Sequence, residues 1–154
     1  MIEPILKFMH IIGAAVLFGT GVGIAFFMVL AHRDGRPVVV AAVARIVVIA
    51  DFVFTATAVV LQPITGVALA LHENYPLTTP WIMISVMLYV ITGAFWIPVV
   101  FMQKRMRDLA AEAARTGAAL PEEYHRLYRR WFGFGFPAFA AVLAIFWLMI
   151  AKPG

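Results

Sequence analysis

The chain has 154 residues, of which 64% are hydrophobic and 13% charged, with a formal net charge of +4 and no cysteine. Soluble domains carry about 25% charged residues, so this composition excludes a water-soluble globular domain and predicts an integral membrane protein. The lack of cysteine excludes a disulfide framework and a thiolate metal site. The basic residues lie between apolar runs, which indicates contact with lipid head groups rather than nucleic acid.

Four apolar runs follow one another along the chain. They are Phe8–Ala31, Ile46–Leu71, Trp81–Met102 and Trp131–Ala151. Each is long enough to cross a bilayer core about 30 Å thick as an α-helix. The first run is longer than the apolar part of a secretion signal, and we interpret it as a retained helix. We expect spans at about 5–31, 42–71, 80–102 and 131–151, within a single transmembrane domain covering 1–154.

The connections between the runs differ in length. Residues 34–37 predict a short turn, and the connection at 72–80 ends at Pro80, which suits the first turn of a helix. In the third connection, charged residues and alanines at 103–115 continue the third helix, 116–117 interrupt it, and 120–123 begin a new helix. The predicted fold is all-α: a transmembrane four-helix bundle with a cytoplasmic helical hairpin between helices 3 and 4.

Lysines and arginines gather in the first and third connections and are absent from the second. The positive-inside rule therefore places the first and third connections in the cytoplasm, and both termini outside, in the inner (cytoplasmic) membrane. The termini contribute only Lys7 and Lys152. The basic residues of the two connections are Arg33, Arg36, Arg45, Lys104, Arg105, Arg107, Arg115, Arg126, Arg129 and Arg130. We expect His32 and His125, beside these arginines, to be solvated.

His10 is the foremost candidate for a functional residue, because an ionisable group inside a span is energetically costly. It lies roughly two turns into the first helix. A neutral imidazole there binds a metal or haem iron through one nitrogen and a hydrogen-bond partner through the other. Gly13 shares nearly the same face and leaves room for a flat group or for a close helix. The alternative is a histidine that bonds a backbone carbonyl of a neighbouring helix.

Candidates for a second iron ligand lie near the same end of the bundle. His72 ends the second span, and Met83 and Met87 lie four residues apart on the third. Two histidines on one side of a bundle can be the two axial ligands of a b-type haem. The alternatives are a solvated interfacial His72 and methionines that serve packing.

The second span carries three further polar residues. Arg45 lies near its cytoplasmic boundary, where a long side chain reaches the head groups. Asp51 lies deeper and needs a partner on another helix, for which Arg129 and Arg130 are candidates. The functional alternative for Asp51 is a proton relay or a clamp on an anionic group. Gln62 precedes Pro63, and together they predict a kink in this helix.

Glycines in the first span form a face of small residues. Gly19 and Gly23 are four positions apart, a spacing that allows close helix contact. Such a face serves packing within the bundle or a homodimer in the lipid bilayer.

These residues resemble a family of predicted integral membrane proteins, domain of unknown function 2269. The resemblance rests on residues 6–13 (Leu-Lys-Phe-Met-His-Ile-Ile-Gly) and 17–21, on Asp51, on 62–66 (Gln-Pro-Ile-Thr-Gly), on Tyr75-Pro76-Leu77, on Pro80-Trp81, and on Trp96 with Pro98. It covers nearly the whole chain and implies a membrane fold without assigning an activity.

More distantly, the lysine–x–x–histidine opening is similar to HemJ-type protoporphyrinogen oxidases and CopD-type copper-resistance membrane proteins. The HemJ resemblance implies haem b bound through a first-helix histidine, here His10. The third span of this chain has no lysine, which is a departure from that group. The resemblance therefore implies haem binding and leaves the reaction open.

Three functions follow from these observations. The leading hypothesis is a haem-b-binding membrane protein for electron transfer or redox chemistry, a haem-dependent oxidoreductase that works with a redox partner. The second is a transporter element for a metal ion or small molecule, with His10, Asp51 and Gln62 along its path. The third is a non-catalytic membrane assembly subunit that uses the hairpin and the glycine face.

Overall fold

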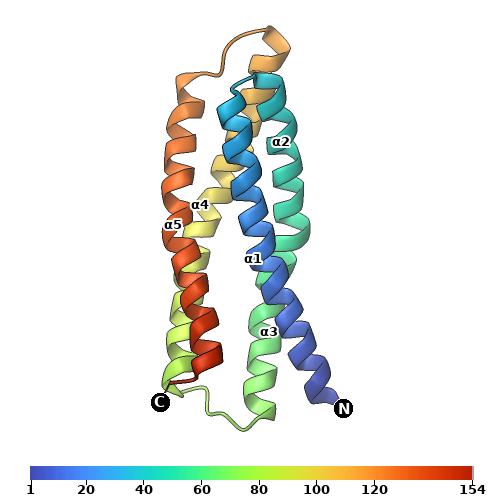
Figure 1. The fold of residues 1–154 in the computed structure, drawn as a ribbon, viewed down its shortest axis with the longest axis vertical. Helices are drawn as coiled ribbons and strands as arrows, with labels where there is room; N and C mark the ends of the chain where they lie inside the picture. Colours follow the sequence, from blue (N-terminus) through green and yellow to red (C-terminus); the bar gives the residue numbers. More distant parts are fainter. Residues whose placement is uncertain (154) are drawn as a thin grey trace.

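Long helices build the part of the chain that the computed structural model describes, residues 1–153 (Figure 1). Four helices are long and apolar enough to cross a membrane. The all-α four-helix bundle predicted from the sequence is confirmed. In chain order the elements are α1 (Ile2–Asp34), α2 (Pro37–Ala50), the π-helical turn η1 (Asp51–Thr55), α3 (Ala56–His72), α4 (Pro80–Thr116) and α5 (Glu122–Ala151), with α2, η1 and α3 continuous.

Glycine and proline set the helix ends as the sequence predicts. Gly35 has φ 76°, and its N–H donates to the Ala31 carbonyl at 3.1 Å, closing α1. Gly117 closes α4 in the same way with φ 69°. A residue without Cβ adopts this left-handed conformation without strain. Pro37 and Pro80 occupy first helical positions, where the missing N–H has no intrahelical partner to lose.

Large apolar side chains face outward. Among the exposed residues are Phe8, Phe26, Phe27, Phe101 and Trp147. The fully buried positions hold mainly smaller or flexible side chains, such as Val40, Ala44, Met28 and Met106. Lipid tails solvate exposed apolar groups, and close helix packing drives association inside a bilayer. This inside-out distribution matches an integral membrane protein.

The two ends of the bundle are packed differently. We call the end with the first and third connections the basic end, and the end with both termini the terminal end. The main buried core lies at the basic end and draws on all four long helices, including Met28, Val40, Met106 and Tyr124. Towards the terminal end, α4 and α5 separate from α1 and α3 (Figure 1). There α1 packs on α3, and α4 packs on α5.

Aromatic side chains bridge the two helix pairs where they separate. The Phe18 ring of α1 lies 5.8 Å from Phe139 and 5.6 Å from Phe146, both on α5. The Tyr89 hydroxyl of α4 donates a hydrogen bond to the Val59 carbonyl of α3. The separation is therefore spanned by a few large groups rather than by close backbone packing.

The α-helical pattern of the second span is interrupted at Asp51–Thr55, where the Ala56 N–H bonds the Asp51 carbonyl five residues earlier. The kink predicted at Gln62–Pro63 falls within α3, which stays helical through Pro63. A π-helical turn widens the helix locally and often marks a special site. Here it places the Asp51 side chain inside the bundle.

The glycine face of α1 lies mostly on the outside of the bundle. Gly19 is exposed, and a Cβ added there would meet nothing within 4 Å. A Cβ at Gly23 would meet only Phe27 of the same helix, at 3.8 Å. Within this chain the face therefore does not serve close packing between helices.

A hydrogen-bonded aromatic cluster joins α1 to α5 at the basic end. The expectation that His32 is solvated is wrong. Its Nδ1 lies 3.2 Å from the Tyr124 hydroxyl, and its ring stacks on Tyr128 with centroids 3.5 Å apart. Burial, and to a lesser extent His125, lowers the pKa of the His32 imidazole. His32 therefore favours its neutral form and packs as an aromatic ring.

Candidate functional site

His10 lies on the face of α1 that packs against α3. Its Nδ1 lies 2.8 Å from the Thr65 hydroxyl oxygen. That hydroxyl lies 2.8 Å from the Leu61 carbonyl and 3.2 Å from the Gln62 carbonyl. We assign its single proton to the Leu61 carbonyl, the usual acceptor for a threonine within a helix. In this assignment Thr65 accepts from His10, and Nδ1 carries the imidazole proton. The lone pair of the neutral ring is then on Nε2.

Two glycines let α1 and α3 approach closely around His10. A Cβ at Gly66 would stand 3.2 Å from His10 Cε1, so Gly66 provides the space in which the imidazole lies. A Cβ at Gly13 would overlap the Gln62 amide nitrogen, which donates to the His10 carbonyl at 2.9 Å. Of the two roles that the sequence leaves open for Gly13, the structure shows the close helix contact. The space is filled by Gln62, not by a flat group.

The second ring nitrogen of His10 is free. Among residues 1–153 we find no hydrogen-bond partner for His10 Nε2. Among residues 1–153, Thr55 Oγ1 is the one side-chain nitrogen or oxygen that is both fully buried and unpaired. His10 Nε2 is unpaired and is not fully buried, so it reaches the surface of the α1–α3 pair. An imidazole whose Nδ1–H is fixed by a hydrogen bond presents an oriented lone pair, which is the arrangement found in metal and haem ligands.

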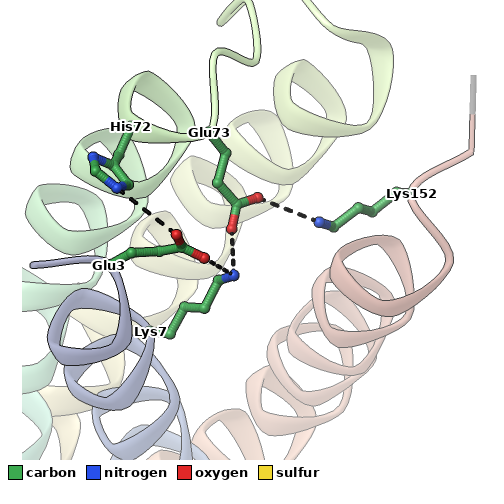
Figure 2. A network of polar contacts seen from close by, with 5 residues as sticks. All are labelled: Glu3, Lys7, His72, Glu73 and Lys152. Carbon is green, nitrogen blue, oxygen red and sulfur yellow. Dashed lines mark hydrogen bonds and ion pairs between the residues drawn. The ribbon is translucent and has the colours of Figure 1, made fainter. Parts of the chain in front are cut away.

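His72 belongs to a network of charged groups at the terminal end (Figure 2). Its Nε2 lies 3.8 Å from a Glu3 carboxylate oxygen. Lys7 Nζ lies 2.5 Å from Glu3 and 2.8 Å from Glu73, and Lys152 Nζ lies 3.7 Å from Glu73. The Lys7 ammonium holds the pKa of both carboxyls below the usual range. This terminal network ties α1, the end of α3 and the end of α5 together.

The structure does not bring a sequence-predicted second ligand to His10. His72 lies six residues beyond Gly66, about 9 Å further along the helix axis, on the same α1–α3 seam. It therefore does not stand opposite His10 across a ring. Met83 and Met87 are each 56% exposed, on α4, which packs against α5 and α2.

Asp51, the first residue of η1, forms a second polar site with residues of α4 and α5. The residue is 4% exposed. The Trp96 indole N–H donates to one carboxylate oxygen at 3.3 Å. In the amide orientation that satisfies both of its neighbours, Gln103 donates to the other oxygen at 2.8 Å and accepts from the Trp131 indole at 3.1 Å. Each carboxylate oxygen therefore has an N–H partner.

The predicted partners of Asp51 were wrong. Arg129 pairs with Glu122 at 3.1 Å, and Arg130 is exposed. The sequence analysis did not single out Gln103, Trp131 or Trp96 as partners of Asp51. One signal was available: the four apolar runs contain no lysine or arginine, so a carboxylate deep in one of them depends on neutral N–H donors. Gln103 directly precedes Lys104, Trp131 directly follows Arg130, and Asp51 lies six residues after Arg45, so all three lie at a similar distance from the basic end.

The three polar residues of the second span lie at three different positions in the bundle. Gln62 joins the His10 site, Asp51 forms its own, and Arg45 is exposed at the basic end. Asp51 and Gln62 are eleven residues apart, about 16 Å along the helix. Among residues 1–153 no group of three or more His, Asp or Glu side chains gathers to hold a metal ion. His10 therefore offers one ligand nitrogen on its own.

Comparison with known proteins assigns the chain to a described family. The model of the family described as "Predicted integral membrane protein (DUF2269)" matches residues 4–153. No curated protein and no solved structure matches the chain.

Proposed function

The chain belongs to the DUF2269 family of predicted integral membrane proteins, and we propose that it binds haem b through His10 for electron transfer or another redox reaction. One observation carries this proposal: the Thr65 hydroxyl pairs with His10 Nδ1 and orients the ring, which leaves Nε2 without a partner among residues 1–153. A haem needs only one protein nitrogen, because its porphyrin supplies the other four, and a single axial histidine is a common arrangement.

The neighbours of His10 suit this role. Thr65 fixes the tautomer and, by accepting from Nδ1–H, makes Nε2 a better electron donor. Gly66 gives the ring its position, and Gln62 holds the His10 backbone. Bound haem would supply one-electron redox chemistry, and the protein supplies the ligand, its orientation and an apolar surrounding that tunes the reduction potential. A redox partner is part of this proposal.

The transport hypothesis has less support. It requires His10, Gln62 and Asp51 along one path, but these side chains lie in two separate sites with different partners. Both Asp51 oxygens are already paired with N–H donors inside the bundle. A carboxylate held in this way ties helices together.

A haem assay tests the proposal. The full chain is expressed in haem-replete cells and purified in detergent, and haem is measured as the pyridine haemochrome. We expect a Soret band, about one haem per chain, and loss of both in His10→Ala. His72→Ala is the matched control and should keep its haem, because His72 pairs with Glu3. A colourless wild-type protein, or a red His10→Ala variant, would contradict the proposal.

We also propose that the basic end faces the cytoplasm and both termini face outside, in the inner membrane. The chain has no cysteine, so single cysteines can report topology. Ala118→Cys lies in the α4–α5 connection, and Thr78→Cys lies in the connection between α3 and α4. In intact cells an impermeant maleimide should label Thr78→Cys and leave Ala118→Cys unlabelled. The reverse pattern would invert the proposed orientation.

A further inference from the structure

A cleft opens between α2 and α4 at the basic end of the bundle. It is open to the surface and has a volume of about 490 Å³. Its lining combines small and charged side chains, and both helices contribute residues of each kind. The lining residues are Ala41, Ala42, Arg45, Arg107, Asp108 and Ala111.

The cleft carries an excess of positive charge. Arg45 makes no ion pair within residues 1–153, and Arg107 pairs with Asp108 at 2.9 Å. Lys104, one turn before Arg107 and Asp108, lies over the Phe52 ring of η1 at 5.8 Å and also has no carboxylate partner in this part of the chain. The lining therefore holds two cations and one carboxylate, and Lys104, one turn away on α4, brings the local net charge to +2. A single phosphate monoanion would find two uncompensated cations here.

The depth of the cleft matches a lipid head group. Arg45 directly precedes the apolar run that starts at Ile46, and Lys104 follows the apolar run that ends at Met102. Both cations thus mark the boundary where the hydrocarbon begins. Basic pockets between transmembrane helices at this depth are suited to anionic lipid head groups.

A smaller cavity of about 20 Å³ lies deeper along the same seam and is lined by Asp51, Phe52, Ala56, Trp96 and Val100. Its volume is close to that of one water-sized probe, so an acyl chain would lie along the lipid-facing surface of the seam. Phe52 and Ala56 lie seven and eleven residues beyond Arg45, and Val100 and Trp96 lie seven and eleven residues before Arg107. Seven and eleven are repeats of a regular α-helix, so α4 turns one face to both cavities. On the other side of the seam, the π-helical turn at Asp51–Thr55 shifts the face between Arg45 and Ala56. The smaller cavity begins about 10 Å deeper than the cleft.

We propose that this cleft binds the phosphate of an anionic phospholipid, with Arg45, Arg107 and Lys104 as phosphate ligands and an acyl chain along the α2–α4 seam. A free phosphate ion shares the head-group chemistry. The position of the cleft, where the apolar runs begin, favours the lipid. The alanines matter because they leave the space open: a larger side chain at Ala111 would fill the cleft without changing its charge.

Thermal unfolding of the purified full chain in detergent micelles tests the proposal. Wild-type protein is titrated with phosphatidylglycerol, with phosphatidylcholine, and with inorganic phosphate. We expect phosphatidylglycerol to raise the Tm by about 5 °C at saturation, since a ligand that binds only the folded state stabilises it. The other two additions should leave the Tm within about 1 °C. Equal shifts with both lipids, or a full shift with phosphate alone, would overturn the proposal.

Three variants locate the effect. Arg45→Gln and Ala111→Leu should each weaken apparent phosphatidylglycerol affinity about tenfold, the first by charge and the second by volume. Arg115→Gln removes the same charge from an arginine that pairs with Glu112 outside the cleft, and it should bind like wild type. Native mass spectrometry counts retained lipids independently of the Tm of each variant. Equal losses in Arg45→Gln and Arg115→Gln, or normal binding by Ala111→Leu, would refute this site.

Discussion

Two polar sites lie inside the bundle, one around His10 between α1 and α3 and one around Asp51 between η1, α4 and α5. At the Asp51 site each carboxylate oxygen accepts from an N–H group, and three elements are tied together. At the His10 site one ring nitrogen is paired and the other is free. A buried polar group whose atoms are all paired serves stability, whereas a group with an oriented free atom is prepared for a ligand.

The largest expected effect on stability comes from Asp51→Leu. The substitution leaves the Trp96 N–H and the Gln103 amide without their acceptors inside the bundle. Unpaired buried donors cost about 1–3 kcal/mol, which lowers the Tm by about 5 °C for a chain of this size. Melting followed by tryptophan fluorescence measures it. Asp34→Leu, at the exposed end of α1, is the control. Equal Tm values for the two variants would contradict a structural role for Asp51.

The next effect concerns the space around the imidazole. In Gly66→Leu the new side chain begins 3.2 Å from His10 Cε1 and must displace the ring. We expect haem content to fall below about one tenth of wild type, with the helical circular dichroism signal unchanged. Gly93→Leu is the matched control, because a Cβ at Gly93 meets nothing within 4 Å. If Gly66→Leu kept its haem, the placement of the His10 imidazole beside Gly66 as an iron ligand would be wrong.

A smaller effect is expected at the hydrogen bond that fixes the tautomer. Thr65→Val removes the acceptor of His10 Nδ1–H while keeping the side-chain shape. Loss of such a partner weakens metal binding by about 10-fold or more, measurable by haem titration of the variant. Thr65→Ser should restore wild-type affinity, and Thr57→Val, which removes an exposed hydroxyl bonded to Val53, should have no effect. Equal affinity of the Val and Ser variants at position 65 would contradict this role.

The smallest effect lies in the terminal network. Lys7 lowers the pKa of Glu73 from its ordinary value near 4.5. The folded-state pKa is thus below the unfolded one, so this stabilisation is present above pH 4.5 and is lost as the pH falls through the folded pKa. Between pH 6 and pH 3.5 the wild-type Tm should fall by about 1–2 °C more than that of Glu73→Gln. Parallel curves for the two proteins would show that the ion pairs contribute nothing.

The sequence predicts the fold well because its strongest signals are local. Apolar runs define the four helices, Gly35 and Gly117 end two of them, and Pro80 starts another. The side-chain partners are different, because they depend on how helices rotate against one another. The π-helical turn at Asp51–Thr55 contains no glycine or proline from which it could be predicted. This turn determines which way the Asp51 side chain points, and the carboxylate therefore meets Trp96 and Gln103 rather than an arginine.

The His10 site could be predicted from the sequence in part. An ionisable residue in an apolar run is conspicuous in the sequence, and so is the Gln62–Gly66 stretch that turns out to face it. Which of these residues contacts His10, and through which nitrogen, follows only from the packing of α1 on α3. The glycines illustrate the limit: Gly13 and Gly66 both make room, but one accommodates Gln62 and the other accommodates the imidazole.

Chemical rescue of a cavity at position 10 tests the central claim most directly. His10→Gly removes the imidazole and leaves its space beside Gly66 and Thr65. We expect this variant to be purified without a Soret band, and to bind haem when free imidazole is added, since the small molecule can occupy the ligand position. His72→Gly with imidazole should match His72→Gly without it. A His10→Gly protein that holds haem unaided, or that imidazole fails to rescue while its fold is intact, would contradict a ligand role for His10.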